Sequence, residues 1–266
     1  MPRPNLLFSL SFSRVRVGAD SGQSLSLTTL RPFKSKEFGR QILIIYGGTV
    51  EKNFVEMVRR SLAMDLLRLG FVVHCFDFRS NKEGTRFHNY GLYDRVEDAR
   101  SAIEWLANQE KYLPLSVLGV SMGVYVAIRA IAESHVKVEN LILVAPAAYA
   151  DAACRPDIKF GRKFSEIIRR FESWRESSIF KQAGQIGISS DVLMIVYGRD
   201  SVIPSEITKE YEIAFLKSSL SGNSGSRFCR VTLKELDHGG LFTDRAKRNS
   251  VVGVIKEFLS RNKKKM

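Results

Sequence analysis

Apolar and polar positions follow two different spacings along the chain, and the change falls near residue 40. Between residues 8 and 27 apolar side chains alternate with polar ones around an Asp-Ser-Gly turn at 20–22, which predicts a β-hairpin. Residues 42–45, Ile-Leu-Ile-Ile, form an unbroken apolar run, which is typical of a parallel strand covered on both faces. We therefore expect a parallel sheet with an antiparallel hairpin at one edge.

Strands and helices alternate along most of the remaining chain. Apolar runs predict further strands at 71–78, 115–120, 141–145, 192–197 and 231–236. Helical spacing predicts helices at 54–69, 94–106, 122–132 and 251–259. The second of these begins at Asp94, which has the spacing of a capping box with Glu97. This repetition is typical of α/β proteins, so one mostly parallel sheet with helices on both faces is expected.

The interval from 147 to 190 is too long for an ordinary connection and predicts an insertion with its own structure. Within it a single helical stripe is formed by Phe164, Ile167, Ile168, Phe171 and Trp174. Such a stripe suits a helix that packs on the body, a lid that faces a ligand, or both. We therefore predict a core domain in two parts, 1–146 and 191–266, with a cap or lid between them. A Ser/Gly-rich stretch at 218–226 predicts a flexible surface loop.

Candidate chemistry starts at residues 119–123, which read Gly-Val-Ser-Met-Gly. This G-x-S-x-G pentapeptide stands where a predicted strand ends and a predicted helix begins, which is the setting that holds a serine out at the carboxyl end of a sheet. The flanking glycines leave room for a very tight turn, and the helix start favours developing negative charge. Ser121 is therefore the predicted nucleophile; the alternative is a structural serine in a turn.

A serine hydroxyl needs a base, and the chain has four histidines. His238 follows the last predicted strand and is followed by two glycines that leave its imidazole room, so it is the preferred base. His88, in a polar loop after a strand, is not excluded by its position. His74 falls within a strand and is expected to be a buried or edge residue, and His135, in a helix-to-strand connection, is expected to be solvated.

The imidazole needs a carboxylate to orient it and to stabilise its cation. Asp200 follows the strand at 192–197, so it is expected at the same edge of the sheet as Ser121. Asp237 ranks second because neighbouring side chains at such a turn rarely face one another. The alternative for Asp200 is a surface turn or a helix cap.

Acyl transfer also needs hydrogen-bond donors for the oxyanion. The backbone N–H of Met122, directly after the nucleophile, is one candidate. The second is expected from the glycine turn at 46–49, with Gly48 preferred and Thr49 next. A plain glycine turn is the alternative there.

From about residue 6 to 259 the chain resembles the α/β-hydrolase family. The resemblance rests on the order of its parts: a hairpin, a strand, a glycine turn, a G-x-S-x-G elbow, an insertion, an Asp after a strand and a His after the last strand. The resemblance implies Ser121 as nucleophile, Asp200 as acid and His238 as base, with a cap at the insertion. Residues 77–79, Asp-Phe-Arg, followed by Gly84, are similar to a degraded form of the family's D-x-R-G-x-G segment.

Two departures from the family pattern occur near the predicted site. Many members have His-Gly before the oxyanion turn, where this chain has Tyr46 and Gly47. One residue separates Gly198 from Asp200, where the family often has two. Among subgroups the chain resembles compact serine esterases and acyl thioesterases, which implies hydrolysis of an ester or acyl thioester through an acyl-enzyme intermediate.

For the acyl group we predict a substrate site formed by Phe164, Ile168, Phe171 and Trp174. The apolar character of this site favours small-molecule acyl esters or thioesters over peptides. A different class of function is an α/β-hydrolase-fold protein that binds a ligand and turns it over slowly or not at all.

Composition narrows the remaining possibilities. Apolar residues make up 44% of the 266-residue chain and no apolar run is long enough for a membrane helix, so a soluble protein without integral membrane association is expected. The net charge of +13 favours anionic substrates such as coenzyme A thioesters, while no nucleic-acid motif is recognised. Three scattered cysteines indicate a reducing, cytoplasmic setting, and no metal or other cofactor is expected. The sequence leaves the oligomeric state open.

Overall fold

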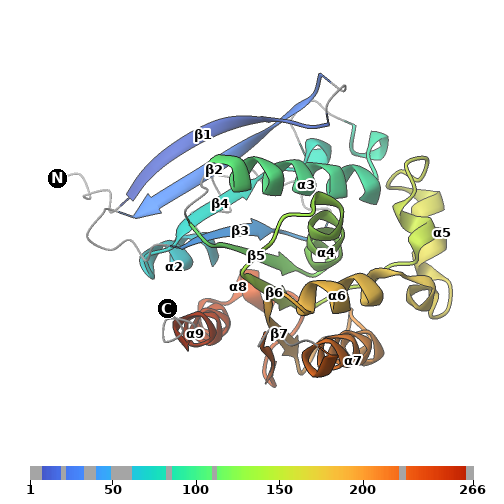
Figure 1. The fold of residues 1–266 in the computed structure, drawn as a ribbon. Helices are drawn as coiled ribbons and strands as arrows, with labels where there is room; N and C mark the ends of the chain where they lie inside the picture. Colours follow the sequence, from blue (N-terminus) through green and yellow to red (C-terminus); the bar gives the residue numbers. More distant parts are fainter. Residues whose placement is uncertain are drawn as a thin grey trace.

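The computed structural model describes residues 8–18, 22–32, 40–48, 62–81, 86–109, 113–221 and 226–261. Within these residues eight strands form one sheet in the order β1-β2-β4-β3-β5-β6-β7-β8 (Figure 1). Their bounds are β1 Phe8–Arg16, β2 Ser24–Pro32, β3 Gln41–Ile45, β4 Val72–Phe76, β5 Leu115–Val120, β6 Asn140–Val144, β7 Asp191–Tyr197 and β8 Phe228–Leu233. Every strand that the apolar pattern predicts is present.

The sheet changes from antiparallel to parallel at β4. Strand β1 pairs antiparallel with β2, and β2 pairs antiparallel with β4 in the register Leu27 to Phe76. All pairs from β4 through β3, β5, β6 and β7 to β8 are parallel. The predicted fold class, an α/β-hydrolase fold with an N-terminal antiparallel hairpin, is therefore confirmed.

Helices cover both faces of the sheet. Their bounds are α2 Leu62–Arg68, α3 Leu92–Gln109, α4 Met122–Ser134, α5 Arg162–Arg169, α6 Ile179–Gly187, α7 Ser205–Ser221, α8 Gly240–Thr243 and α9 Arg245–Arg261, with short 3-10 turns η2 Arg79–Asn81, η3 Phe87–Asn89, η4 Asp151–Cys154 and η5 Ser173–Glu176. Successive strand residues face opposite sides: Leu141 and Leu143 pack with α3, α4, α6 and α7, whereas Ile142 and Val144 pack with α2 and α9. This double burial explains the unbroken apolar runs.

Several helix boundaries differ from the prediction, and α9 begins at Arg245 rather than at the predicted residue 251. Helix α3 begins at Leu92, two residues before the predicted cap Asp94. The Asp94 carboxylate instead accepts the backbone N–H of Gly91 at 2.7 Å, which is how a residue inside the first turn satisfies a donor at the helix start. Helix α2 covers the end of the predicted helix at 54–69, and residues 54–61 lie outside the described residues.

Helix α7 was not predicted by the apolar spacing. It continues to Ser221, so residues 218–221 of the predicted loop are helical. Its exposed face carries apolar side chains, among them Ile213 and Leu216, so the sequence shows no clean division into apolar and polar faces.

The segment 147–190 contains η4, α5, η5 and α6 rather than one long helix. Helix α5 ends at Arg169, and Glu172 has a left-handed backbone with φ 48°. The predicted five-residue stripe is therefore wrong beyond Ile168: Phe171 projects into solvent with 92% of its surface exposed, while Trp174 is buried.

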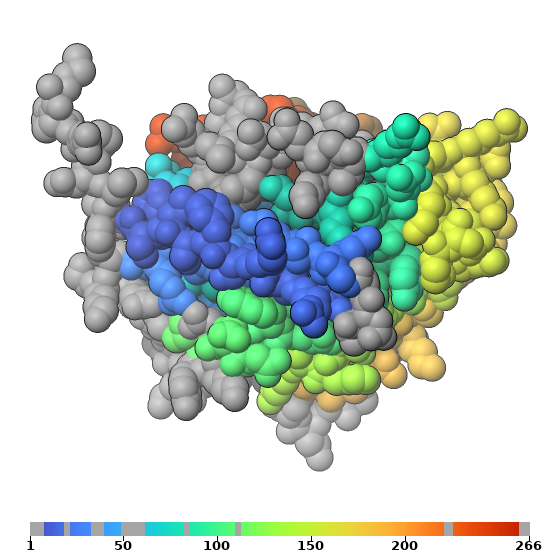
Figure 2. Space-filling view, turned by 90° about the horizontal axis from the view of Figure 1, so that it is seen from above, coloured from blue at the N-terminus to red at the C-terminus, as the bar shows by residue number. Residues whose placement is uncertain are grey.

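This segment packs against the chain that follows β4. The backbone N–H of Phe160 donates to the carbonyl of Tyr90 at 2.7 Å, and the Phe160 ring stacks on Phe87 with 4.8 Å between centroids. Figure 2 shows the segment in yellow at one end of the molecule, beside the turquoise residues that follow β4 and apart from the blue hairpin. No helix in the described part of the chain is long and apolar enough to span a membrane.

Candidate active site

Ser121 sits in a sharp turn between β5 and α4. Its backbone has φ 55° and ψ −121°, a conformation rarely adopted by residues other than glycine, and its N–H donates to the carbonyl of Val144 at 2.9 Å. A Cβ on Gly119 would lie 2.7 Å from the Cα of Val124, and one on Gly123 would overlap the backbone oxygen of Ile45. Glycine is therefore sterically required on both sides of the serine.

Three side chains from distant segments meet at this turn. The Oγ of Ser121 lies 3.0 Å from Nε2 of His238, and Nδ1 of His238 lies 2.9 Å from Oδ2 of Asp200. The imidazole is 24% exposed and the carboxylate 7% exposed. The candidate nucleophile, base and acid of the sequence thus form one hydrogen-bonded chain.

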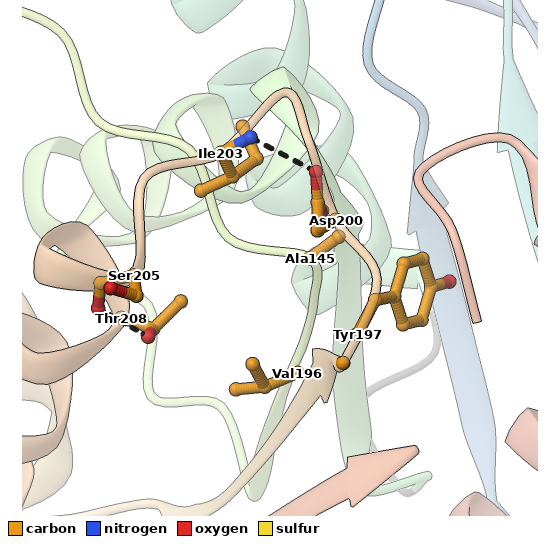
Figure 3. Close-up of a pocket in the computed structure, with 8 residues that line it drawn as sticks. Ala145, Val196, Tyr197, Asp200, Ile203, Ser205 and Thr208 are labelled. Carbon is orange, nitrogen blue, oxygen red and sulfur yellow. Dashed lines mark hydrogen bonds between the residues drawn. The ribbon is translucent and has the colours of Figure 1, made fainter. Parts of the chain in front are cut away.

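The Asp200 carboxylate is held in place by its own loop. Its Oδ1 accepts the backbone N–H groups of Val202 at 2.8 Å and Ile203 at 2.9 Å, and the second of these bonds is drawn in Figure 3. Because Oδ1 is occupied in this way, Oδ2 is directed at the imidazole. A carboxylate oriented in this manner keeps Nδ1 protonated and leaves Nε2 as the acceptor that faces the hydroxyl.

The alternative acid and the other three histidines do not take part in this hydrogen-bonded chain. Asp237 forms an ion pair with Lys247 at 2.7 Å, and this hydrogen bond lowers the pKa of the Asp237 carboxyl. His88 is exposed, with its Nδ1 2.8 Å from the carbonyl oxygen of Phe160. His135 is exposed after α4, as expected, and His74 is buried within β4.

The glycine turn after β3 lies against the start of α4. A Cβ on Gly47 would lie 2.6 Å from the backbone nitrogen of Met122, so the two backbones are in close contact. Gly48 has a left-handed backbone with φ 85°, which a glycine adopts without strain. The two candidate oxyanion donors, Met122 and Gly48, are therefore in neighbouring segments, while the second choice Thr49 lies outside the described residues.

A family model described as serine aminopeptidase, S33, a hydrolase family, matches residues 41–193, which is more than half of the chain. The chain belongs to this family. The matched region runs from β3 to the start of β7 and includes the Ser121 turn, whereas Asp200 and His238 lie beyond it.

Solved structures with the same fold span nearly the whole S33-family chain. A predicted CIB-like hydrolase from Thermoplasma acidophilum is 17% identical with TM-score 0.59, covering 94% of this chain and 99% of that one. The esterase Pf2001 from Pyrococcus furiosus is 19% identical with TM-score 0.66, covering 96% and 90%. A thermostable esterase from Pseudomonas putida is 16% identical with TM-score 0.64, covering 97% and 83%. A search of curated proteins returned no match.

A small pocket of about 110 Å³ opens beside Asp200 in this S33-family protein (Figure 3). It lies at the carboxyl ends of β6 and β7 and is lined by Ala145, Val196, Tyr197, Gly198, Asp200, Ile203, Ser205 and Thr208. The four residues predicted to bind the acyl group are not among them. The pocket could not be predicted from the apolar spacing, because α7, which supplies Ser205 and Thr208, has no clear amphipathic pattern.

The predicted acyl-site residues have different environments. Phe164 is buried beside Phe160, with 5.1 Å between ring centroids, and Trp174 is buried beside Phe180 at 6.1 Å. Ile168 is partly buried against the same core. Phe171 alone is fully exposed.

Arg95 was not among the predicted site residues; it is a buried residue of α3 whose guanidinium donates to the carbonyl of Gly48 at 2.6 Å. An isolated arginine in a helix carries no sequence signal of this contact. Within the described residues, no group of three or more His, Cys, Asp and Glu side chains is placed to hold a metal ion.

Proposed function

We propose that this protein is a serine hydrolase that cleaves a carboxylic ester or acyl thioester through Ser121, His238 and Asp200. The observation that carries the proposal is the continuous hydrogen-bonded chain from Oγ of Ser121 through both imidazole nitrogens of His238 to Asp200. Its position at a strained turn between a strand and a helix supports a reactive rather than a structural serine.

In the first half of the reaction Oγ of Ser121 attacks the carbonyl carbon of the substrate while its proton passes to Nε2 of His238. The carbonyl oxygen takes the negative charge, and the backbone N–H groups of Met122 and Gly48 are the proposed donors to it. When the tetrahedral intermediate collapses, the bond to the alcohol or thiol breaks, and that leaving group takes the proton from His238.

Water completes the cycle. It attacks the acyl-enzyme carbonyl while giving one proton to His238, and the second collapse returns that proton to Oγ of Ser121 and releases the carboxylic acid. Asp200 holds the imidazole through Nδ1 and stabilises the imidazolium in each half-reaction.

We propose that the segment 147–190 is a cap between the two parts of the core, 1–146 and 191–266. The apolar side chains of Phe164, Ile168 and Trp174 in this segment support an apolar acyl site, for which Phe171 would have to fold inward. The positive net charge supports substrates with an anionic leaving group, such as coenzyme A.

Labelling with a fluorophosphonate tests the nucleophile directly. The wild-type protein should gain one adduct on Ser121, found by intact mass and peptide mapping, and the Ser121→Ala variant should gain none. Ser250→Ala is the matched control because Ser250 is an exposed hydroxyl of α9, and it should label like the wild type. A folded wild-type protein that binds an intact ester but gains no adduct would instead be a ligand-binding protein.

A substrate panel separates the remaining classes of acyl donor. We expect p-nitrophenyl esters or acyl-coenzyme A thioesters of medium chain length to be hydrolysed faster than aminoacyl p-nitroanilides. For a coenzyme A thioester, kcat/KM should fall as ionic strength rises, because salt screens the attraction of the basic surface. Faster cleavage of the p-nitroanilides would establish an aminopeptidase and contradict the ester preference.

We also propose that the protein works in the cytoplasm. All three cysteines are free, and Cys75 and Cys154 are buried as thiols, which supports a reducing setting. Fractionation of cells that express the natural protein tests this.

A further inference from the structure

Arg95 is a cation enclosed by aromatic rings behind the proposed site. It is 1% exposed, and its Cζ lies 4.6 Å from the ring centroid of Phe78 and 4.8 Å from that of Phe160. Guanidinium groups are attracted to aromatic faces, and the attraction grows when water is excluded. The rings therefore hold the side chain of Arg95 in one place.

One guanidinium nitrogen of Arg95 touches both residues that we propose as oxyanion donors. Its Nη1 donates to the carbonyl oxygen of Gly48 at 2.6 Å and lies 3.4 Å from Sδ of Met122. Its Nη2 donates to Oγ of Ser80 at 3.4 Å and to Oδ1 of Asn81 at 3.3 Å. These two longer bonds fix the far side of the guanidinium plane.

Within the described residues, these hydrogen bonds of Arg95 all go to neutral acceptors. The nearby carboxylate Asp98 is bonded to Arg79 instead, through Nε at 2.5 Å and the backbone N–H at 2.9 Å. Burial lowers the pKa of Arg95 to about 10, so the guanidinium stays charged at neutral pH. Among the described residues this buried guanidinium forms no ion pair of its own, and a charge in such surroundings is costly to the fold. Such a cost suggests a role beyond packing.

The geometry points to Arg95 as a positioning residue for the oxyanion site, one that fixes the Gly48 turn against the start of α4. This inference rests on the proposed function. Gly48 has the left-handed backbone of a residue with wide conformational freedom, so a hydrogen bond to its carbonyl removes much of that freedom. Donors that are held in place before the reaction stabilise an oxyanion better than donors that must reorient.

The buried positive charge of Arg95 also favours stabilisation of the oxyanion. In a region of low dielectric, a cation next to the donor backbone raises the local positive potential and favours negative charge on the carbonyl oxygen. Arg95 does not touch the reacting atoms in this account; it acts through Gly48 and Met122.

The test compares Arg95→Met with Arg95→Lys and with Arg129→Met, a matched loss of a partly buried arginine on α4 that is paired with Glu133 and Asp151. For each variant we would measure kcat and KM on the best p-nitrophenyl ester, the melting temperature, and the Ki of a trifluoromethyl ketone with the same acyl chain. The ketone adds to Oγ of Ser121 and forms a stable oxyanion, so its Ki reports on the oxyanion site.

We expect Arg95→Met to lower kcat by about 10- to 100-fold with KM changed by less than about threefold, and to raise the ketone Ki by a factor similar to the loss in kcat/KM. Arg95→Lys keeps a cationic donor and should recover part of the loss in both quantities. Arg129→Met should leave kcat and Ki near wild type even where its melting temperature falls.

The inference is overturned if Arg95→Met lowers kcat while the ketone Ki stays at the wild-type value, because the residue would then act outside the oxyanion site. An unchanged kcat overturns it as well. If Arg95→Met does not fold, Arg95→Lys carries the same comparison of kcat with Ki. Failure of the proposed function is distinguishable, since the wild-type protein would then neither react with fluorophosphonate nor bind the ketone.

Discussion

Two histidines, one within the sheet and one beyond its last strand, each make two side-chain hydrogen bonds but have opposite surroundings. His74 of β4 is 1% exposed; its Nδ1 lies 3.0 Å from Oγ1 of Thr29, and its Nε2 lies 3.0 Å from Oε1 of Gln41. Burial, together with the positive charge of Arg31, lowers the pKa of His74 to about 3. This imidazole is neutral at every pH near 7 and ties β2, β3 and β4 together.

His238 follows β8 at the carboxyl edge of the sheet and remains partly open to solvent. Its partners are a carboxylate, Asp200, and a hydroxyl, Ser121. A carboxylate partner stabilises a positive ring, whereas the neutral partners and burial of His74 oppose one. The two imidazoles therefore differ in the charge of their partners and in their access to water, and not in the number of their side-chain hydrogen bonds.

Replacing each histidine by asparagine should have the largest effects, on activity for one histidine and on stability for the other. His238→Asn should lower kcat by about 10³-fold or more, because the serine loses its base, and should change the free energy of unfolding by less than about 1 kcal/mol. His74→Asn should do the reverse, with a loss of about 2–3 kcal/mol in stability from the cavity and unpaired groups, and kcat within about threefold of wild type. Ester turnover and urea unfolding of both variants provide the measurement. Equal losses of kcat in the two would contradict the assignment of roles.

Replacing a glycine by alanine should destabilise the protein more at the Ser121 turn than in the outer helices. Gly123→Ala should lower the free energy of unfolding by about 3 kcal/mol, because the new methyl group would meet the carbonyl oxygen of Ile45, a main-chain atom that cannot rotate away. Urea unfolding monitored by circular dichroism measures this. A stability equal to wild type would show that the turn and β3 can separate at little cost.

The dependence of stability on pH should reveal the burial of His74. The pKa of His74 is depressed in the folded protein, so the unfolded chain binds the proton more readily below pH 6.5, and the stabilising contribution is present above that pH and lost as pH falls toward 3. Between pH 6.5 and 5 the wild-type protein should lose about 2 kcal/mol from this group. His74→Asn should lose correspondingly less over the same range, as measured by urea midpoints at each pH. Parallel pH profiles would contradict the shift.

The smallest effect is expected at Gly253 in α9, the control for Gly123. An added Cβ there meets no atom within 4 Å, so Gly253→Ala should raise stability by about 0.5–1 kcal/mol through higher helix propensity alone. Thermal unfolding of Gly123→Ala and Gly253→Ala therefore separates the loss of stability caused by a steric clash from the gain caused by higher helix propensity. A drop in stability for Gly253→Ala would mean that α9 is not a regular, open helix at this point.

The fold could be predicted largely from local patterns. The parallel strands β3 to β7 are largely buried on both faces, so their sequences are mostly apolar, whereas no residue of the edge strand β8 is fully buried. The strand ends agree with the prediction to within about three residues except in β2, which continues to Pro32. The helices that escaped prediction, α6, α7 and the short α8, lie after residue 178, where apolar residues are also exposed or the pattern is short. Spacing alone does not distinguish such helices from loops.

Order along the chain was enough to nominate Ser121, His238 and Asp200, because the carboxyl ends of parallel strands meet at one edge of the sheet whatever lies between them. The need for glycine on both sides of the serine could also be read from the sequence, since a turn this tight leaves no room for side chains. The tertiary structure alone decided that Asp237 turns to Lys247, that Phe171 faces solvent, and that Arg95 reaches Gly48 across 47 positions of the chain. Contacts of this kind depend on how separate elements pack, and no local spacing of residues encodes that packing.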